Sequence, residues 1–380
     1  MKYCFLLLLL LFCSTWVQSQ TPPPRYRNLV MEGGGIRGIA YGGALLELEQ
    51  RGVLAGIERV GGTSAGAIQA ALLAVGYSAQ EIVDVVNRTP VQRLNDGRFI
   101  FVGGSTRLLR QYGWYRGDQF TRYLSELVAR KTGNPNLTLG QLHQLTAQRR
   151  GTRNLYVTGT NLTTQRVQVF SYETHPDLRV ADAVRISMSI PLYFRAVLLD
   201  EQGRVVQKPA RGQQVQVLVD GGLLANYPID LFDHPRYQSG TSAEAPAVVA
   251  SSSVAKKDAT REDATRRQAS SVAAAPTPPF INLETLGLRL DRAEQITLDT
   301  APAGRQALAP YPIRDFGSYV GALYNVAIEN LNPARPEDWP RTISISTLGF
   351  NPKIKQIPAA QKQQLLESGR QGVQAFFVRQ

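Results

Sequence analysis

Ser64 lies at the centre of the segment GTSAG (62–66), and its surroundings make it a candidate nucleophile. The segment matches G-x-S-x-G, whose glycines let a chain turn sharply from a strand into a helix. The preceding IERVGG (57–62) predicts a strand and the following SAGAIQAALLAVG (64–76) predicts a helix. A serine at such a turn is lifted out of the sheet, and the positive end of the helix favours an alkoxide. The expected chemistry is attack on an acyl group.

A second glycine-rich turn, EGGGIRG (32–38), comes one strand–helix unit earlier. It fits G-x-G-x-x-G, the pattern typical of a dinucleotide-binding turn. A dinucleotide fold also needs an acid at the end of the second strand. Here Glu58 lies at the start of that strand, and the Ser64 turn occupies its end. We therefore interpret the loop as a source of backbone amides for an oxyanion, with a nucleotide-binding protein as the alternative of another class.

Asp220 is the candidate base. The segment QVQVLV (214–219) predicts a strand that ends at this carboxyl group, and Gly221 and Gly222 keep the approach to it open. An isolated Asp-Gly is more typical of a turn. A carboxylate is nevertheless an adequate base if the pKa of the serine is lowered nearby.

The three histidines offer another base. His143 falls in a predicted helix, while His175 and His234 each precede a proline in a predicted loop. An α/β-hydrolase orders its residues Ser, acid, His and has several strands before the nucleophile. Only one strand–helix unit precedes Ser64, which argues against that topology. A Ser-His-Asp triad using His175 or His234 is kept as the alternative.

These residues need a sheet to position them. Strands and helices alternate through the first seventy residues after position 27, which predicts a parallel sheet covered by helices. We expect a catalytic core over 28–236 and a further part of the same domain over 281–380, with helices near 315–328 and 359–374. Between them, 237–280 is rich in Ala, Ser, Thr and Pro, which predicts a mobile insertion.

The N-terminus has the pattern of a secretory signal peptide, which we assign to 1–19, followed by a linker over 20–27. The predicted location is therefore periplasmic, secreted or outer-membrane associated, with an N-terminal membrane anchor as the alternative. The 380-residue chain has two cysteines, Cys4 and Cys13, so the processed protein would have neither a disulfide nor a thiolate metal site. Its net charge of +12 favours anionic surfaces. We expect no nucleic-acid partner, because acids interrupt the densest cluster of Lys and Arg.

EGGGIRG, GTSAG and DGG, in this order, closely resemble the motifs of the patatin-like phospholipases. RISMSIPLYF and LLANYPIDLF are similar as well, and the resemblance covers about 26–236. It implies a three-layer α/β/α sandwich with a mainly parallel central sheet. It also implies a Ser–Asp dyad in which Ser64 is the nucleophile and Asp220 the base.

The resemblance further implies an oxyanion hole built from the backbone amides of Gly34, Gly35 and Arg37. The motif glycines are Gly33, Gly38, Gly62, Gly66, Gly221 and Gly222. The implied substrates are phospholipids or other acyl-ester lipids, cleaved through an acyl-serine intermediate without a metal or cofactor. Peripheral contact with a membrane surface is left open, as is the oligomeric state. A further alternative is that the protein is a catalytically inactive, lipid-binding member of the family.

Overall fold

The computed structural model describes residues 25–89, 96, 108, 112–148, 151–239, 280–299, 308–315, 318–319, 322, 325–326, 335–350 and 357–379. The predicted signal peptide (1–19), most of the linker (20–27), most of the insertion (237–280) and most of the predicted helix near 315–328 lie outside the described residues.

The core is a mixed sheet in which five neighbouring strands are parallel, as the alternation of strands and helices predicts. The remaining pairs, β4–β9, β9–β7, β7–β8 and β4–β5, are antiparallel. In sheet order the strands are β11 (Thr342–Ser346), β10 (Thr285–Asp291), β1 (Asn28–Met31), β2 (Arg59–Gly62), β4 (Asn154–Asn161), β9 (Gln216–Asp220), β7 (Val197–Leu199) and β8 (Val205–Val206), with β5 (Arg166–Phe170) on β4.

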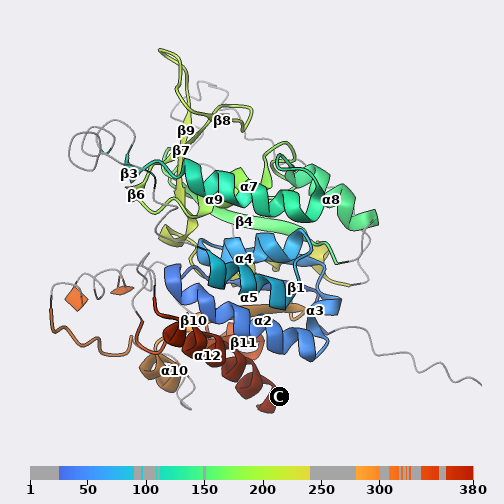
Figure 1. The fold of residues 1–380 in the computed structure, drawn as a ribbon, viewed down its shortest axis with the longest axis vertical. Helices are drawn as coiled ribbons and strands as arrows, with labels where there is room; N and C mark the ends of the chain where they lie inside the picture. The colour runs from blue at the N-terminus through green and yellow to red at the C-terminus, as the bar shows by residue number, and fades with distance from the viewer. Residues whose placement is uncertain are drawn as a thin grey trace, which may run out of the picture.

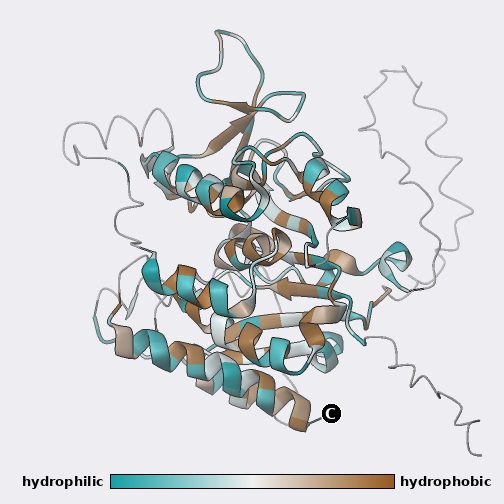
Figure 2. Ribbon diagram, turned by 45° about the vertical axis from the view of Figure 1, so that its right-hand side comes forward, coloured by the Kyte–Doolittle hydropathy of each residue, from teal (hydrophilic) through white to brown (hydrophobic). Residues whose placement is uncertain are grey.

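Long helices cover one face of this sheet (Figure 1). Among them, α12 packs on β11, α4 on β1 and β2, and α8 and α9 on β4, while α5 packs against α2 and α7 against α9. Figure 2 shows hydrophobic and hydrophilic residues mixed along α12, as expected for a helix with one face on the protein. The α-helices are α2 (Ala40–Gln50), α3 (Val53–Gly56), α4 (Ala65–Ala74), α5 (Ala79–Arg88), α7 (Asp118–Thr132), α8 (Leu139–Gln148), α9 (Val180–Ser187), α10 (Ala293–Asp299) and α12 (Ala359–Val378).

The opposite face is covered, as far as the chain is described, by short 3-10 helices. Val30 of β1 and Tyr156 of β4 pack there against Phe232 and Tyr237. These aromatic residues come from η4 (Ile229–Phe232) and η5 (Pro235–Tyr237). The other 3-10 helices are η1 (Gly35–Ile39), η3 (Gly221–Leu223) and η6 (Pro336–Arg341).

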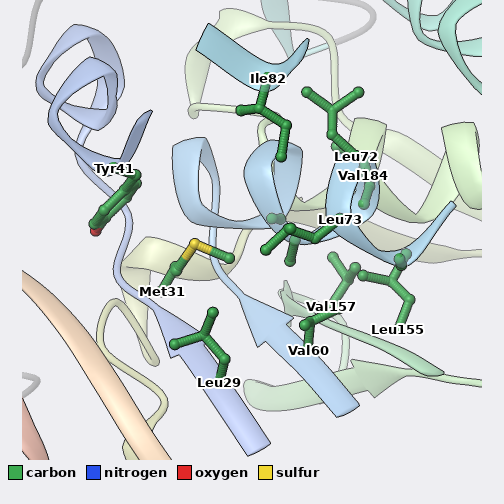
Figure 3. Close-up of a cluster of buried hydrophobic side chains, with 14 of the residues drawn as sticks. Leu29, Met31, Tyr41, Val60, Leu72, Leu73, Ile82, Leu155, Val157 and Val184 are labelled. Atoms are coloured by element: carbon green, nitrogen blue, oxygen red, sulfur yellow. The ribbon is translucent and has the colours of Figure 1, made fainter. Parts of the chain in front are cut away.

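The hydrophobic core explains why β1 is apolar from Leu29 to Met31. Leu29 and Met31 point toward the helices, where Val60 and Val157 join them from neighbouring strands (Figure 3). Val30, between Leu29 and Met31, faces the other layer. Strands with both faces buried are expected to read as continuous hydrophobic runs.

Local signals in the sequence also determine where elements begin. Ser78 accepts a hydrogen bond from the Glu81 amide, and the Glu81 carboxylate accepts one from the Ser78 amide, so a capping box starts α5. A separate two-stranded ribbon of β3 (Gly113–Tyr115) and β6 (Leu192–Phe194) has no counterpart in the sequence-based prediction. Among the described residues, no helix is both long and apolar enough to cross a membrane.

Candidate active site

Ser64 lies at a strained turn between β2 and α4. Its φ of 51° and ψ of −115° place a non-glycine residue in a conformation that side chains rarely adopt. The turn also requires its glycines, because a Cβ on Gly66 would lie 2.1 Å from the Met31 carbonyl oxygen. A Cβ on Gly62 would lie 2.7 Å from the same oxygen. The predicted elbow is therefore present, and its strain is of the kind found at functional sites.

Asp220 reaches Ser64 because strand β4 extends beyond the end of β2. The pairing of β2 with β4 ends at Gly62 and Val157, and β4 continues to Asn161. Strand β9 runs antiparallel along this extension and ends with Asp220 opposite Gly159. The carboxyl group thus arrives two residues past the end of β2, where the Ser64 turn begins.

The Asp220 carboxyl group is buried and interacts with the candidate nucleophile. Burial raises its pKa to about 7, and hydrogen bonds from the Gly222 amide and the Ser64 hydroxyl act in the opposite direction. The Gly222 amide lies 2.8 Å from Oδ1 of Asp220. The Asp220 amide in turn donates to the Ser189 carbonyl at 2.9 Å, and the Ser64 amide to Oγ of Ser187 at 2.9 Å. Ser64 and Asp220 are therefore both anchored to the end of α9.

The glycine-rich loop supplies two amides suited to an oxyanion. Among the described residues, the amides of Gly34 and Gly35 donate no hydrogen bond. The Arg37 amide, by contrast, donates to the Gly34 carbonyl at 3.2 Å, so it is already engaged. The Arg37 side chain holds the loop, because its Nε donates to the same carbonyl at 3.1 Å.

The loop is packed directly against the serine turn. A Cβ on Gly33 would come within 3.3 Å of the Ser64 Cβ, and one on Gly38 within 2.8 Å of the Ala65 Cβ. No carboxylate follows β2, which ends at Gly62 and continues into Thr63 and Ser64. The acid that a dinucleotide-binding fold carries at this strand end is therefore missing.

Asn226 connects the glycine-rich loop to the chain segment that follows Asp220, and we did not predict this role from the sequence. Its Nδ2 donates to Oε1 of Glu32 at 2.9 Å and to the Gly33 carbonyl at 3.3 Å. The backbone carbonyl of Asn226 accepts a hydrogen bond from the Gly33 amide at 3.0 Å. The other Glu32 oxygen accepts from the Leu290 amide at 2.7 Å. The one signal available in the sequence was an acid, Glu32, directly after an apolar strand.

An apolar cavity of about 160 Å³ opens beside Ser64. The loop forms part of its wall through Gly35 and Gly38, together with residues from several other elements. These include Ile68 and Leu72 of α4, Phe120 and Leu124 of α7, and Met188 and Phe194 after α9. A cavity of this kind suits a hydrocarbon chain rather than a polar group.

Each of the three histidines is engaged away from Ser64 and Asp220. His143 stacks on Tyr172 and its Nδ1 lies 2.8 Å from Oδ1 of Asn154. His175 contacts the Gln168 side chain, and the Nδ1 of His234 accepts from the Arg236 amide. The geometry therefore offers a carboxyl group, and none of these imidazoles, as the partner of Ser64.

Comparisons with known proteins agree with the motifs. Residues 29–233, more than half of the chain, match the family model described as patatin-like phospholipase. The chain is 32% identical over 220 residues to the uncharacterised protein YqhO of Bacillus subtilis. It is 25% identical over 210 residues to the probable lipid hydrolase 463L of Invertebrate iridescent virus 6. These matches cover 56% and 55% of this chain, and 68% and 64% of the two relatives, so parts of both relatives lie outside the comparison.

The fold also has a counterpart among solved structures. VipD from Legionella pneumophila superposes with a TM-score of 0.53 at 16% identity, over 94% of this chain and 67% of that one. This likeness concerns the fold alone. The family follows from the match over 29–233, which spans more than half of the chain. The chain belongs to the patatin-like phospholipase family.

Proposed function

We propose that this protein is a lipid acyl hydrolase that cleaves carboxylic ester bonds with a Ser–Asp dyad. The observation that carries the proposal is the meeting of the strained Ser64 turn with the buried Asp220 carboxyl group, whose pKa the Ser64 hydroxyl lowers, beside an apolar cavity. Membership of a phospholipase family and the relative described as a probable lipid hydrolase support the substrate class.

In the proposed reaction, the acyl chain of the substrate occupies the apolar cavity and its ester carbonyl lies over Ser64. Oγ of Ser64 attacks the carbonyl carbon while its proton passes to the Asp220 carboxylate. The amides of Gly34 and Gly35 stabilise the oxyanion that forms. The tetrahedral intermediate then expels the alcohol, which takes the proton from Asp220, and leaves an acyl-serine.

Water completes the cycle. Asp220 accepts a proton from a water molecule as its oxygen attacks the carbonyl carbon of the acyl-serine. The bond from that carbon to Oγ then breaks, Oγ takes the proton back from Asp220, and the fatty acid is released. A base with a pKa near neutrality suits both steps, because it takes and returns a proton at the same pH. The positive end of α4 and the strained backbone at Ser64 assist by exposing the hydroxyl and favouring its ionised form.

The test is hydrolysis of p-nitrophenyl butyrate and of phosphatidylcholine vesicles by the purified protein. Ser64→Ala and Asp220→Ala should each reduce kcat by about a hundredfold to a thousandfold. His175→Ala and His234→Ala are the matched controls and should retain nearly full activity. A histidine variant as inactive as Ser64→Ala would support the triad alternative and contradict the dyad.

Covalent labelling tests the nucleophile without turnover. A fluorophosphonate should form a bond from Oγ of Ser64 to phosphorus with loss of fluoride, so the peptide that contains Ser64 gains the mass of the label. Asp220→Ala should slow labelling, and Ser64→Ala should abolish it. Labelling at another serine, with Ser64 unmodified, would overturn the assignment.

A further inference from the structure

Two bulky apolar side chains are exposed at the tip of the β3–β6 ribbon. Tyr112 is 55% exposed and Leu192 is 68% exposed, and Leu192 is paired in register with Gly113, the neighbour of Tyr112. Figure 1 shows the two strands of this ribbon side by side at one side of the molecule. Both residues have positive φ angles, 60° for Tyr112 and 67° for Leu192. This conformation is costly for such residues, yet here the fold uses it to present them to solvent.

The tip lies beside the cavity of the candidate active site. Leu192 stands between Ile190 and Phe194, which both line the apolar cavity next to Ser64. Leu192 does not itself line that cavity, and neither does Tyr112. The exposed pair is thus attached to one wall of the cavity without contributing to it.

A positively charged cleft of about 640 Å³ adjoins the same tip, because Tyr112 forms part of its wall. Two ion pairs lie in the wall, Arg195 with Asp118 at 3.0 Å and Arg179 with Asp182 at 2.6 Å. The lining has five cations and two carboxylates, so three cations are in excess. Of those three, Arg122 and Lys208 are exposed. The five cations of the cleft are Arg122, Arg179, Arg185, Arg195 and Lys208.

We propose that Tyr112, Leu192 and the cations of this cleft form a docking surface for an anionic phospholipid bilayer. The apolar pair would enter the interface between headgroups and acyl chains, while Arg122 and Lys208 contact lipid phosphates. Charge complementarity favours this occupant over a second copy of the chain, whose net charge of +12 would bring like charges together. The inference rests on the proposed function only in explaining how a lipid ester reaches Ser64.

The first test is co-sedimentation of the Ser64→Ala protein with vesicles, so that turnover does not alter the lipid. Binding should be at least about tenfold tighter to phosphatidylcholine vesicles containing phosphatidylglycerol than to phosphatidylcholine alone, and should weaken with salt. Leu192→Asp should weaken binding about tenfold or more. The matched control is Leu283→Asp, because Leu283 is 63% exposed but precedes the amino end of β10, at the opposite end of the sheet. Equal losses in the two variants would overturn the proposal.

A second pair of variants tests the charges. Arg122 and Arg130 both lie exposed on α7, but only Arg122 lines the cleft. Arg122→Glu should weaken binding to anionic vesicles more than Arg130→Glu does, and the difference should shrink at high salt. An equal effect of the two changes would mean that net charge alone drives binding and would contradict the proposed surface.

Hydrolysis measurements separate this inference from the proposed function. Leu192→Asp in the otherwise unchanged protein should hydrolyse soluble p-nitrophenyl butyrate normally and anionic vesicles about tenfold more slowly. Vesicle binding that depends on Leu192, in a protein without esterase activity, would support docking and refute the hydrolase. Esterase activity, combined with vesicle binding that Leu192→Asp leaves unchanged, would support the hydrolase and refute the docking surface. A dimer in sedimentation velocity that Leu192→Asp dissociates would identify a second copy as the occupant and overturn the inference.

Discussion

Asn226 donates a hydrogen bond from Nδ2 to Oε1 of Glu32 at 2.9 Å, and both side chains are buried. The bond joins the loop that carries Gly34 and Gly35 to the segment that begins at Asp220. The proposed oxyanion hole and the proposed base come from segments that lie far apart in the sequence. Their relative position in the fold therefore depends on such contacts. Asn226 is thus a positioning residue for the proposed oxyanion hole.

Asn226→Ala should therefore lower kcat by about tenfold to a hundredfold with little change in KM for p-nitrophenyl butyrate, because a displaced oxyanion donor acts mainly on the transition state. The matched control is Asn282→Ala, since Asn282 is also buried and donates to the Phe232 carbonyl at 3.1 Å. Both changes should reduce thermal stability. Only the first should reduce kcat of the folded protein, and equal kcat values would contradict the positioning role.

The pH dependence of catalysis should follow Asp220. Burial raises the pKa of its carboxyl group to about 7, and the proposed base acts only when charged. The value of kcat/KM should therefore rise with pH, pass its midpoint near pH 7 and level off above it. The midpoint should remain in place in His175→Ala and His234→Ala. A flat profile between pH 5 and 9, or a midpoint that moves when a histidine is removed, would contradict this assignment.

The free energy of unfolding should depend on the same carboxyl group, but it should fall with rising pH where kcat/KM increases. The pKa is raised on folding, so the folded protein binds the proton more strongly than the unfolded chain, and stability falls as pH rises from about 4 to about 7. Asp220→Asn removes the buried charge. Calorimetry at pH 8 should show a Tm higher by a few degrees, and the difference should shrink toward pH 5.

Asp182→Asn is the contrasting control for this experiment. Asp182 is also buried, but both of its oxygens accept hydrogen bonds from Arg179, at 2.6 and 2.9 Å. Its removal should lower the Tm at pH 8, because a paired charge is lost and not an isolated one. A lower Tm in Asp220→Asn as well would show that the Asp220 charge stabilises the fold.

The sequence indicated the elements on either side of Ser64 because local patterns determine them. The apolar run before Glu32, the glycines of the elbow and the Ser78 cap act through neighbouring residues. The strand pairing that brings Asp220 to Ser64 could not be predicted, because the antiparallel direction of β9 depends on the four-residue extension of β4 beyond β2. The Asn226 contact was missed for the same reason, since it joins residues 194 positions apart.

The cavity beside Ser64 should limit the acyl chains that bind well. Its volume of about 160 Å³ is close to that of an engineered cavity of about 150 Å³ that holds benzene, which suggests room for about six carbons. Ile68 lies one helical turn after Ser64 and lines this space. Ile68→Phe should lower the ratio of kcat/KM for p-nitrophenyl hexanoate to that for the acetate by about tenfold, since added volume excludes part of the chain. Ile68→Ala should shift the optimum to longer esters. If both substitutions left the chain-length profile unchanged, the acyl chain would have to bind elsewhere.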